Sequence, residues 1–86
     1  MKYQVKILPT ALKSLQTIDR KNIKGILNKI SWLAEHISEI VHIPLRGKFS
    51  GLFKLRVGDY RIIYSVEEEE RILTIYFVGH RKDIYQ

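Results

Sequence analysis

The chain has 86 residues, a net charge of +6 and no cysteine. This length suits a single domain over residues 1–86, and the 45% hydrophobic content excludes a disordered chain. The absence of cysteine excludes a disulfide framework, a thiolate zinc site and thiol catalysis. It also fits a protein of a reducing compartment. The longest strongly apolar stretch, Leu73–Val78, is far below the ~20 residues of a membrane helix, and the start lacks a signal-peptide core. We therefore expect a cytoplasmic protein that does not contact membranes.

The positive charge indicates an anionic partner. Fifteen Lys and Arg residues stand against nine Asp and Glu residues. A basic surface attracts polyanions, which include RNA, DNA and acidic protein segments. Net charge alone does not separate binding from simple solubility, so the positions of the cations decide.

The first half of the chain predicts a strand and two helices. Tyr3, Val5 and Ile7 alternate with polar residues, which indicates a strand with one buried face. Pro9 suits the first turn of a helix that carries Leu12, Leu15 and Ile18 at helical spacing, and Asp19 suits the N-cap of a second, longer helix. The second helix repeats apolar residues at steps of three and four: Ile23, Ile26, Leu27, Ile30, Leu33, Ala34 and Ile37.

The second half predicts a loop and three strands. Pro44, Gly47 and Gly51 indicate a loop with at most a short extended piece, and strands follow at about 52–57, 60–66 and 71–78. Gly58-Asp59 is a two-residue connection with glycine first, which favours a type II′ turn. The order β-α-α-β-β-β predicts an α+β fold: a small antiparallel β-sheet with an N-terminal helical hairpin packed on one face.

The turn at Gly58-Asp59 sets a register that gathers cations. It pairs Val57 with Tyr60, Arg56 with Arg61 and Lys54 with Ile63. Phe53, Leu55, Val57, Tyr60, Ile62, Tyr64 and Val66 then share the face that packs on the helices, and Lys54, Arg56 and Arg61 share the other. Like charges directly opposite each other destabilise a sheet, so this pair predicts a bound anion.

The last strand is expected to add to this cluster. A loop at Glu67–Glu70 pairs Val66 with Arg71 and Arg61 with Tyr76, which brings Gly79, His80 and Arg81 to the same end. At ~3.3 Å per residue, Glu68 lies about 23 Å from Arg61. The sequence therefore predicts a phosphate site that contains Lys54, Arg56, Arg61 and Arg81. Protection of the sheet against edge-to-edge association is the alternative explanation for strand cations.

Such a cluster can cleave RNA without a metal ion, and the chain contains no local metal-binding motif or glycine-rich phosphate loop. The ribose 2′-hydroxyl attacks the adjacent phosphate, and fixed guanidinium groups stabilise the charge that develops on its oxygens. Neighbouring cations favour the neutral form of Lys54, which can act as the base. Tyr85 is a candidate for base stacking or proton transfer, and His80 is a further acid–base candidate.

Two segments carry a family resemblance. "LFKLRVGDYRIIY" and "GHRKDIY", with the leading "MKYQVKILPTALKSL", resemble the RelE/ParE superfamily of toxins from type II toxin–antitoxin modules. The resemblance implies a RelE-like fold. RelE-type members are endoribonucleases that cut mRNA in the ribosomal A site without metal or cofactor. By resemblance, Lys54, Arg61, Arg81 and Tyr85 are the catalytic residues, and Leu52 stands where some RelE toxins have a further lysine.

The resemblance also implies partners and alternatives. We assign substrate contacts to Arg56, His80, Arg46 and Lys48, and we expect mRNA, the ribosome and an acidic, partly disordered cognate antitoxin as partners. ParE-type members share the scaffold but inhibit DNA gyrase and lack the nuclease residues. A catalytically inactive module that only binds nucleic acid or protein is the third alternative. The joint presence of the four catalytic candidates favours the RelE type.

Overall fold

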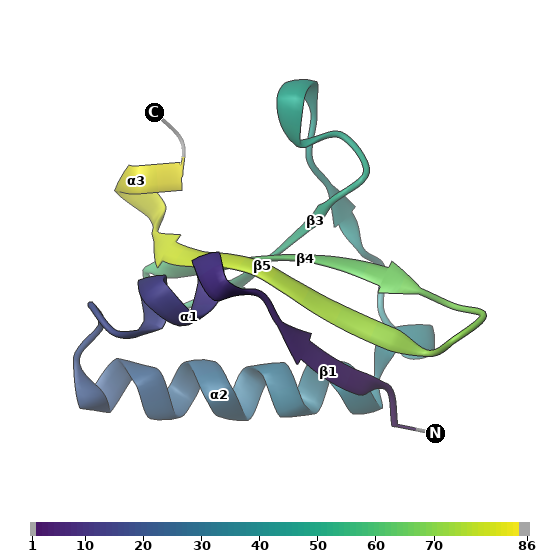
Figure 1. Ribbon diagram of the computed structural model, residues 1–86, viewed down its shortest axis with the longest axis horizontal. Helices are drawn as coiled ribbons and strands as arrows, with labels where there is room; N and C mark the ends of the chain where they lie inside the picture. The colour runs from purple at the N-terminus through teal and green to yellow at the C-terminus, as the bar shows by residue number, and fades with distance from the viewer. Residues whose placement is uncertain (1, 85–86) are drawn as a thin grey trace.

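The structure, a computed structural model, describes residues 2–84, with side chains through residue 82 (Figure 1). A five-stranded sheet has the order β1-β5-β4-β3-β2, and α1 and α2 lie on one side of it (Figure 1). The elements are β1 (Gln4–Ile7), α1 (Pro9–Leu15), α2 (Arg20–Glu35), the 3₁₀-helix η1 (Ile37–Glu39), β2 (Ile43–Pro44), the 3₁₀-helix η2 (Gly47–Phe49), β3 (Phe53–Val57), β4 (Tyr60–Glu67), β5 (Ile72–His80) and α3 (Arg81–Ile84). This arrangement confirms the α+β fold predicted from the sequence. None of the described helices is long and apolar enough to cross a membrane.

The predicted helix signals act as expected. Pro9 begins α1, and the Asp19 side chain caps α2 by accepting a hydrogen bond from the Asn22 backbone N–H at 2.9 Å. The core lies between the helices and the inner face of the sheet, and its buried residues are Tyr3, Ala11, Leu15, Ile26, Ile30, Leu33, Ala34, Ile37, Ile62, Tyr64, Leu73, Ile75 and Val78. Two residues of the predicted apolar helix faces are not buried: Leu12 and Leu27 are 50% and 43% exposed. Ala11 takes the core position on α1 instead.

The pairing of the first strand shows that the prediction of a purely antiparallel sheet was wrong. β1 pairs with β5 in parallel, with Gln4 beside Ile72 and Ile7 beside Ile75, so the sheet is mixed. Hairpins force β3, β4 and β5 to alternate in direction, but no hairpin joins β1 to its neighbour. The backbone N–H of Tyr3 also donates to the carbonyl of Ala34 at 2.8 Å, which ties the start of β1 to the end of α2.

The β3–β4 hairpin confirms the predicted register. Val57 pairs with Tyr60, Arg56 with Arg61 and Lys54 with Ile63. Gly58 has a φ of +60°, whereas Asp59 does not have a positive φ, which agrees with a type II′ turn. The predicted inner-face residues of both strands are buried or packed against the core.

The β4–β5 register was predicted wrongly. Glu67 pairs with Ile72 around a four-residue turn, in which Arg71 adopts a left-handed φ of 56°. A register shift between Ile63 and Tyr64 then leaves one extra residue on β5. The partner of Arg61 is therefore Gly79, three residues beyond the predicted Tyr76.

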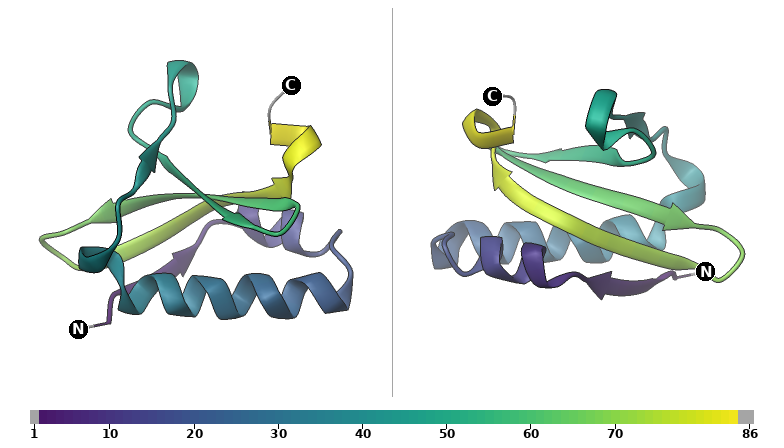
Figure 2. Two further views of the ribbon diagram at one scale, coloured as in Figure 1. Left: turned by 180° about the vertical axis from the view of Figure 1, so that it is seen from behind. Right: turned by 45° about the horizontal axis from the view of Figure 1, so that its top comes forward.

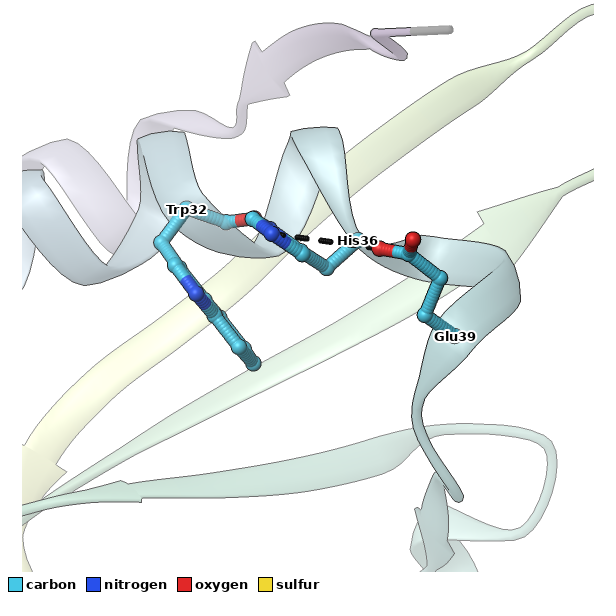
Figure 3. A network of polar contacts seen from close by, with 3 residues as sticks. All are labelled: Trp32, His36 and Glu39. Atoms are coloured by element: carbon cyan, nitrogen blue, oxygen red, sulfur yellow. Dashed lines mark hydrogen bonds and ion pairs between the residues drawn. The ribbon is translucent and has the colours of Figure 1, made fainter.

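The C-terminal end of α2 carries a polar and aromatic stack (Figure 3). His36 is the C-cap, and its Nδ1 donates to the backbone carbonyl of Trp32 at 2.7 Å. The two rings stack with centroids 4.6 Å apart, and His36 Nε2 lies 3.8 Å from Glu39 Oε2 (Figure 3). Lys29 Nζ lies 4.1 Å from the centre of the Trp32 ring. These contacts give His36 and Trp32 structural roles at the helix end.

A partly buried hydrogen-bond chain joins the segment after α2 to the sheet. His42 Nε2 lies 2.8 Å from the carbonyl oxygen of Ile37, and His42 Nδ1 lies 2.6 Å from the Tyr64 hydroxyl. Because a carbonyl only accepts, Nε2 is the donor and Nδ1 accepts the Tyr64 proton. The Phe53 ring contacts both aromatic side chains, so this cluster supports the start of β3 from its inner face.

Burial raises the pKa of Tyr64 from 10.0 to about 12. The folded protein therefore keeps this phenol neutral at a pH where the unfolded chain has already ionised it. The resulting stability is complete below about pH 10 and falls by about 1.4 kcal/mol per pH unit between about pH 10 and 12. Tyr64→Phe should flatten this alkaline slope. At neutral pH it should lower the free energy of unfolding by about 1–3 kcal/mol, because His42 Nδ1 loses its donor.

Urea unfolding from about pH 8 to 11 measures both effects. Tyr76→Phe is the control, because it removes another phenol and keeps Tyr64. A Tyr64→Phe protein with the wild-type alkaline slope would contradict the assignment.

Candidate nucleic-acid interface

Three cations lie on the outer face of the β3–β4 hairpin, away from the helices. Their neighbours Phe53, Leu55 and Val57 pack against the core, so the alternation of side chains turns Lys54 and Arg56 outward. Arg56 stands directly opposite Arg61 across the two strands. Arg56 is exposed, and Lys54 and Arg61 are half-buried. The three side chains thus form one cationic surface at the sheet.

The guanidinium groups are attached to the backbone near the turn. Arg56 Nε donates to the carbonyl of Gly58, and Arg61 Nη1 donates to the carbonyl of Tyr60, both at 3.2 Å. These bonds limit the freedom of two side chains that otherwise have large rotamer entropy. Such preorganised cations stabilise charge that develops on a bound phosphate with little rearrangement.

The end of β5 brings two more groups to the turn. Tyr60 pairs with His80, and the two rings meet edge to face with centroids 5.6 Å apart. The backbone N–H of Arg81 donates to the carbonyl of Asp59 at 2.8 Å, which attaches the start of α3 to the β3–β4 turn. The Arg81 side chain is exposed.

The tautomer of His80 follows from its hydrogen bond. The backbone N–H of Lys82 lies 3.2 Å from His80 Nδ1, and a backbone N–H can only donate. Nδ1 is therefore the acceptor, and the neutral ring carries its proton on Nε2. In this state His80 offers a donor to a phosphate or to a leaving oxygen.

The structure thus places Lys54, Arg56 and Arg61 on the outer face, and it brings the backbone of Arg81 to the β3–β4 turn beside them. His80 is at the same end of the sheet, but its ring contacts Tyr60 on the face that packs against the core. Arg46 and Lys48 are exposed residues at η2. Both η2 and α3 lie on the same side of the sheet, but η2 lies near one end of β3 and α3 near the other (Figures 1 and 2). These two cations therefore lie apart from the Arg81 end. Tyr85 lies outside the described residues.

The four consecutive glutamates, Glu67–Glu70, lie at the other end of β4 from the cations. β4 runs from Tyr60 beside the cations to Glu67, and Glu68–Glu70 follow in the next turn. The length of β4 separates this turn from Arg61, as expected from the sequence. Within residues 2–82, no group of three or more His, Asp or Glu side chains could hold a metal ion.

The sequence reasoning missed two parts of the site. Gly79 lies beside Arg61, where the predicted register had placed Tyr76. The Asp59 carbonyl, which holds Arg81, gives no signal in a sequence because any residue supplies a backbone carbonyl. Gly79 did carry a signal, because a glycine directly before the His80-Arg81 pair indicates a close approach of other groups to the backbone.

Comparisons with known proteins agree on one family. The family model described as "ParE toxin of type II toxin-antitoxin system, parDE" matches residues 5–85. A RelE-like toxin protein of Escherichia coli is 35% identical, with 99% of this chain and 92% of the relative covered. Toxin RelG of Mycobacterium tuberculosis is 29% identical, with 100% and 99% covered.

Comparisons with solved structures agree with this family. The toxin–antitoxin complex RelBE2 of Mycobacterium tuberculosis contains a chain with a TM-score of 0.84 and 27% identity, and the match covers 94% of this chain and 93% of that one. The archaeal RelE–RelB complex of Pyrococcus horikoshii gives a TM-score of 0.75 at 27% identity, with 94% and 97% covered.

The Arg56–Arg61 pair allows a stability test. Replacing Arg56 by Gln removes a like-charge repulsion, so we expect the free energy of unfolding to rise by roughly 0.2–1 kcal/mol at low salt. The gain should vanish near 1 M salt, where the screening length is about 3 Å. Lys24→Gln on the exposed surface of α2 corrects for the lower net charge. Denaturant melts that show Arg56→Gln to be less stable than Lys24→Gln at low salt would contradict the repulsion.

Proposed function

Because the chain belongs to the RelE/ParE family of toxins from type II toxin–antitoxin systems, we propose that it is a metal-independent endoribonuclease. Its substrate is mRNA, cut in the ribosomal A site, and its action inhibits translation. The observation that carries this proposal is that Lys54, Arg56 and Arg61 share the outer face of one hairpin, and that the Arg81 backbone is bonded to the turn of this hairpin. The RelE-like relatives support the same assignment.

The proposed reaction needs a base, an acid and fixed positive charge. Lys54 takes the proton of the ribose 2′-hydroxyl, whose oxygen forms a bond to the adjacent phosphorus. The bond from phosphorus to the 5′-oxygen breaks, and this oxygen receives a proton from a general acid. His80 is a candidate for this acid in its imidazolium form, which returns to the neutral ring when it gives up the proton. The products are a 2′,3′-cyclic phosphate and a 5′-hydroxyl. By resemblance, we also propose that Tyr85 takes part in the reaction.

The guanidinium groups supply the electrostatic part of the proposal. Negative charge builds up on the non-bridging phosphate oxygens in the transition state, and Arg61 and Arg81 offer planar donors to them. Arg56 holds the same phosphate or a neighbouring one. Arg46 and Lys48, on η2, are proposed to contact the RNA farther along the strand.

A cognate antitoxin is the proposed protein partner. Several similar structures are toxin–antitoxin complexes, which supports such a partner for this chain. An acidic segment complements the cationic surface, and a segment that is partly disordered alone can cover a large area. We propose that it masks Arg61 and Arg81 in the complex.

Inhibition of DNA gyrase is the second candidate function. The family model that matches carries the ParE description, and this favours the gyrase alternative. A module that only binds nucleic acid or protein is the remaining alternative. Mapping of mRNA ends in a translation extract supports the nuclease, whereas inhibited supercoiling with intact mRNA supports the gyrase alternative.

Arg81→Ala tests the proposed site directly. We expect a 10²–10³-fold lower rate of mRNA cleavage, because a cation that stabilises the transition state is lost. Folding should be unchanged, since Arg81 is exposed and its backbone bond to Asp59 remains. Lys24→Ala, which removes an exposed charge on α2, should cleave at the wild-type rate. An Arg81→Ala protein that still cleaves at full rate would remove Arg81 from the site.

The antitoxin proposal predicts salt-dependent association. The association rate should fall steeply as ionic strength rises, because salt screens steering beyond about 8–10 Å at physiological strength. Stopped-flow mixing with the protein encoded beside this one measures the rate. An association rate independent of salt, together with unchanged accessibility of Arg61 and Arg81 in the complex, would rule out electrostatic capture and masking.

A further inference from the structure

A surface pocket of about 540 Å³ lies between α1 and the last residues of β5. Here α1 follows β1 along the edge of β5: the Leu8 N–H donates to the Ile75 carbonyl at 3.0 Å, and Thr10 Oγ1 donates to the Tyr76 carbonyl at 2.7 Å. The residues that line it include Lys13, Ser14, Thr17, Phe77, Gly79 and His80. The proposed reaction uses none of these residues except His80.

The pocket lies next to the strand that carries Arg61, because its lining residue Gly79 pairs with that arginine. Arg56, Arg61 and Gly79 are direct neighbours on three adjacent strands, and such strands lie about 4.8 Å apart. The pocket therefore starts one strand away from Arg61. His80 lies at the boundary, because it lines the pocket and also belongs to the proposed site. A nucleic-acid strand with a phosphate at Arg61 can place its next nucleotide over Gly79.

Phe77 offers an aromatic surface at this position. Its side chain is 38% exposed although it lies on a central part of β5. A Cβ atom added to Gly79 would lie 2.6 Å from Phe77 Cε2, so the ring extends over the glycine and depends on its missing side chain. An aromatic ring beside a row of cations is the usual platform for a base of single-stranded nucleic acid.

The hydroxyl groups of α1 give the pocket a defined polarity. Ser14 Oγ donates to the Thr10 carbonyl at 2.9 Å, and Thr17 Oγ1 donates to the Ser14 carbonyl at 2.7 Å. Each hydroxyl has only one proton, so both present acceptor lone pairs to a ligand. Lys13 supplies donors for a phosphate at the rim.

We propose that the α1–β5 pocket binds the base of the nucleotide next to the phosphate at Arg61, with stacking on Phe77 and acceptors on Ser14 and Thr17 that select a base with an amino group. This inference rests on the proposed RNA substrate, and it adds a specificity site to it. Cytosine has an exocyclic amino donor where uracil has a carbonyl acceptor, and the two rings are otherwise similar in size. The pocket should therefore prefer cytosine to uracil.

The test measures equilibrium binding of short 2′-O-methyl oligocytidylate and oligouridylate to the full chain. These probes lack the nucleophilic 2′-hydroxyl, so binding is measured whether or not the protein cleaves RNA. The oligocytidylate should bind roughly 2- to 10-fold more tightly, which is the range of one net hydrogen bond. Thr17→Val should reduce this ratio toward one.

Two variants address the stacking. Phe77→Ala should weaken binding of the oligocytidylate roughly 5- to 150-fold, the equivalent of about 1–3 kcal/mol per stacked base. Gly79→Ala keeps the ring but displaces it, and it should weaken binding in the same direction. Leu12→Ala is the matched control, because Leu12 is an exposed apolar residue of α1 that does not line the pocket. Thermal melts verify that each variant folds.

The outcomes separate this inference from the proposed function. Binding that depends on Phe77 and Gly79, in a protein that cleaves no mRNA, supports the pocket and contradicts the nuclease. Equal affinity for the two probes overturns the selection of an amino group. If Gly79→Ala and Phe77→Ala bind both probes as tightly as Leu12→Ala does, the pocket is not a base site. This conclusion holds even if the same two variants weaken binding of the antitoxin.

Discussion

The two-residue turn at Gly58-Asp59 is the constraint on which the rest of the site depends. A glycine with a φ of +60° closes the hairpin without an extra residue, so each outward residue of β3 has one fixed partner on β4. A slip of one residue would exchange the faces and turn Arg56 into the core. The same turn offers the Asp59 carbonyl to the Arg81 N–H. One local conformation therefore sets the positions of Arg56, Arg61 and Arg81 together.

The two faces of the sheet act on the stability of the protein in opposite directions. The outer face places Arg56 against Arg61, an arrangement that we expect to lower the stability of the free protein. The inner face compensates with buried side chains and with the bond between Tyr64 and His42, which holds the segment after α2 against β4. Since α1 and α2 cover only the inner face, the stabilising contacts do not occupy the surface that the proposed function requires (Figure 2).

The sequence predicted those features that short-range rules determine. Asp19 as a cap, Pro9 at a helix start and the Gly58 turn each depend on a few adjacent residues, and the structure confirms all three. The β5 register failed because a left-handed Arg71 and the shift near Tyr64 carry no distinct sequence signal. The parallel pairing of β1 is a long-range choice that no turn encodes. The cation cluster was still predicted, since three of its members belong to one hairpin.

The register of β5 also decides what surrounds the cations. Had Tyr76 stood beside Arg61, its side chain would have taken the place that the Phe77 ring occupies over Gly79. The turn begins one residue later than predicted, and together with the extra residue on β5 this places Gly79 at that point. The proposed site extends from there toward Phe77 and α1. A phosphate-binding cluster without such an extension can hold any nucleotide equally, because phosphates carry no sequence information. On the proposed assignment, the shift in β5 is the step that would allow an anion site to distinguish bases. An antitoxin that covers the same arginines would close this pocket as well, so neutralisation would need no second contact surface.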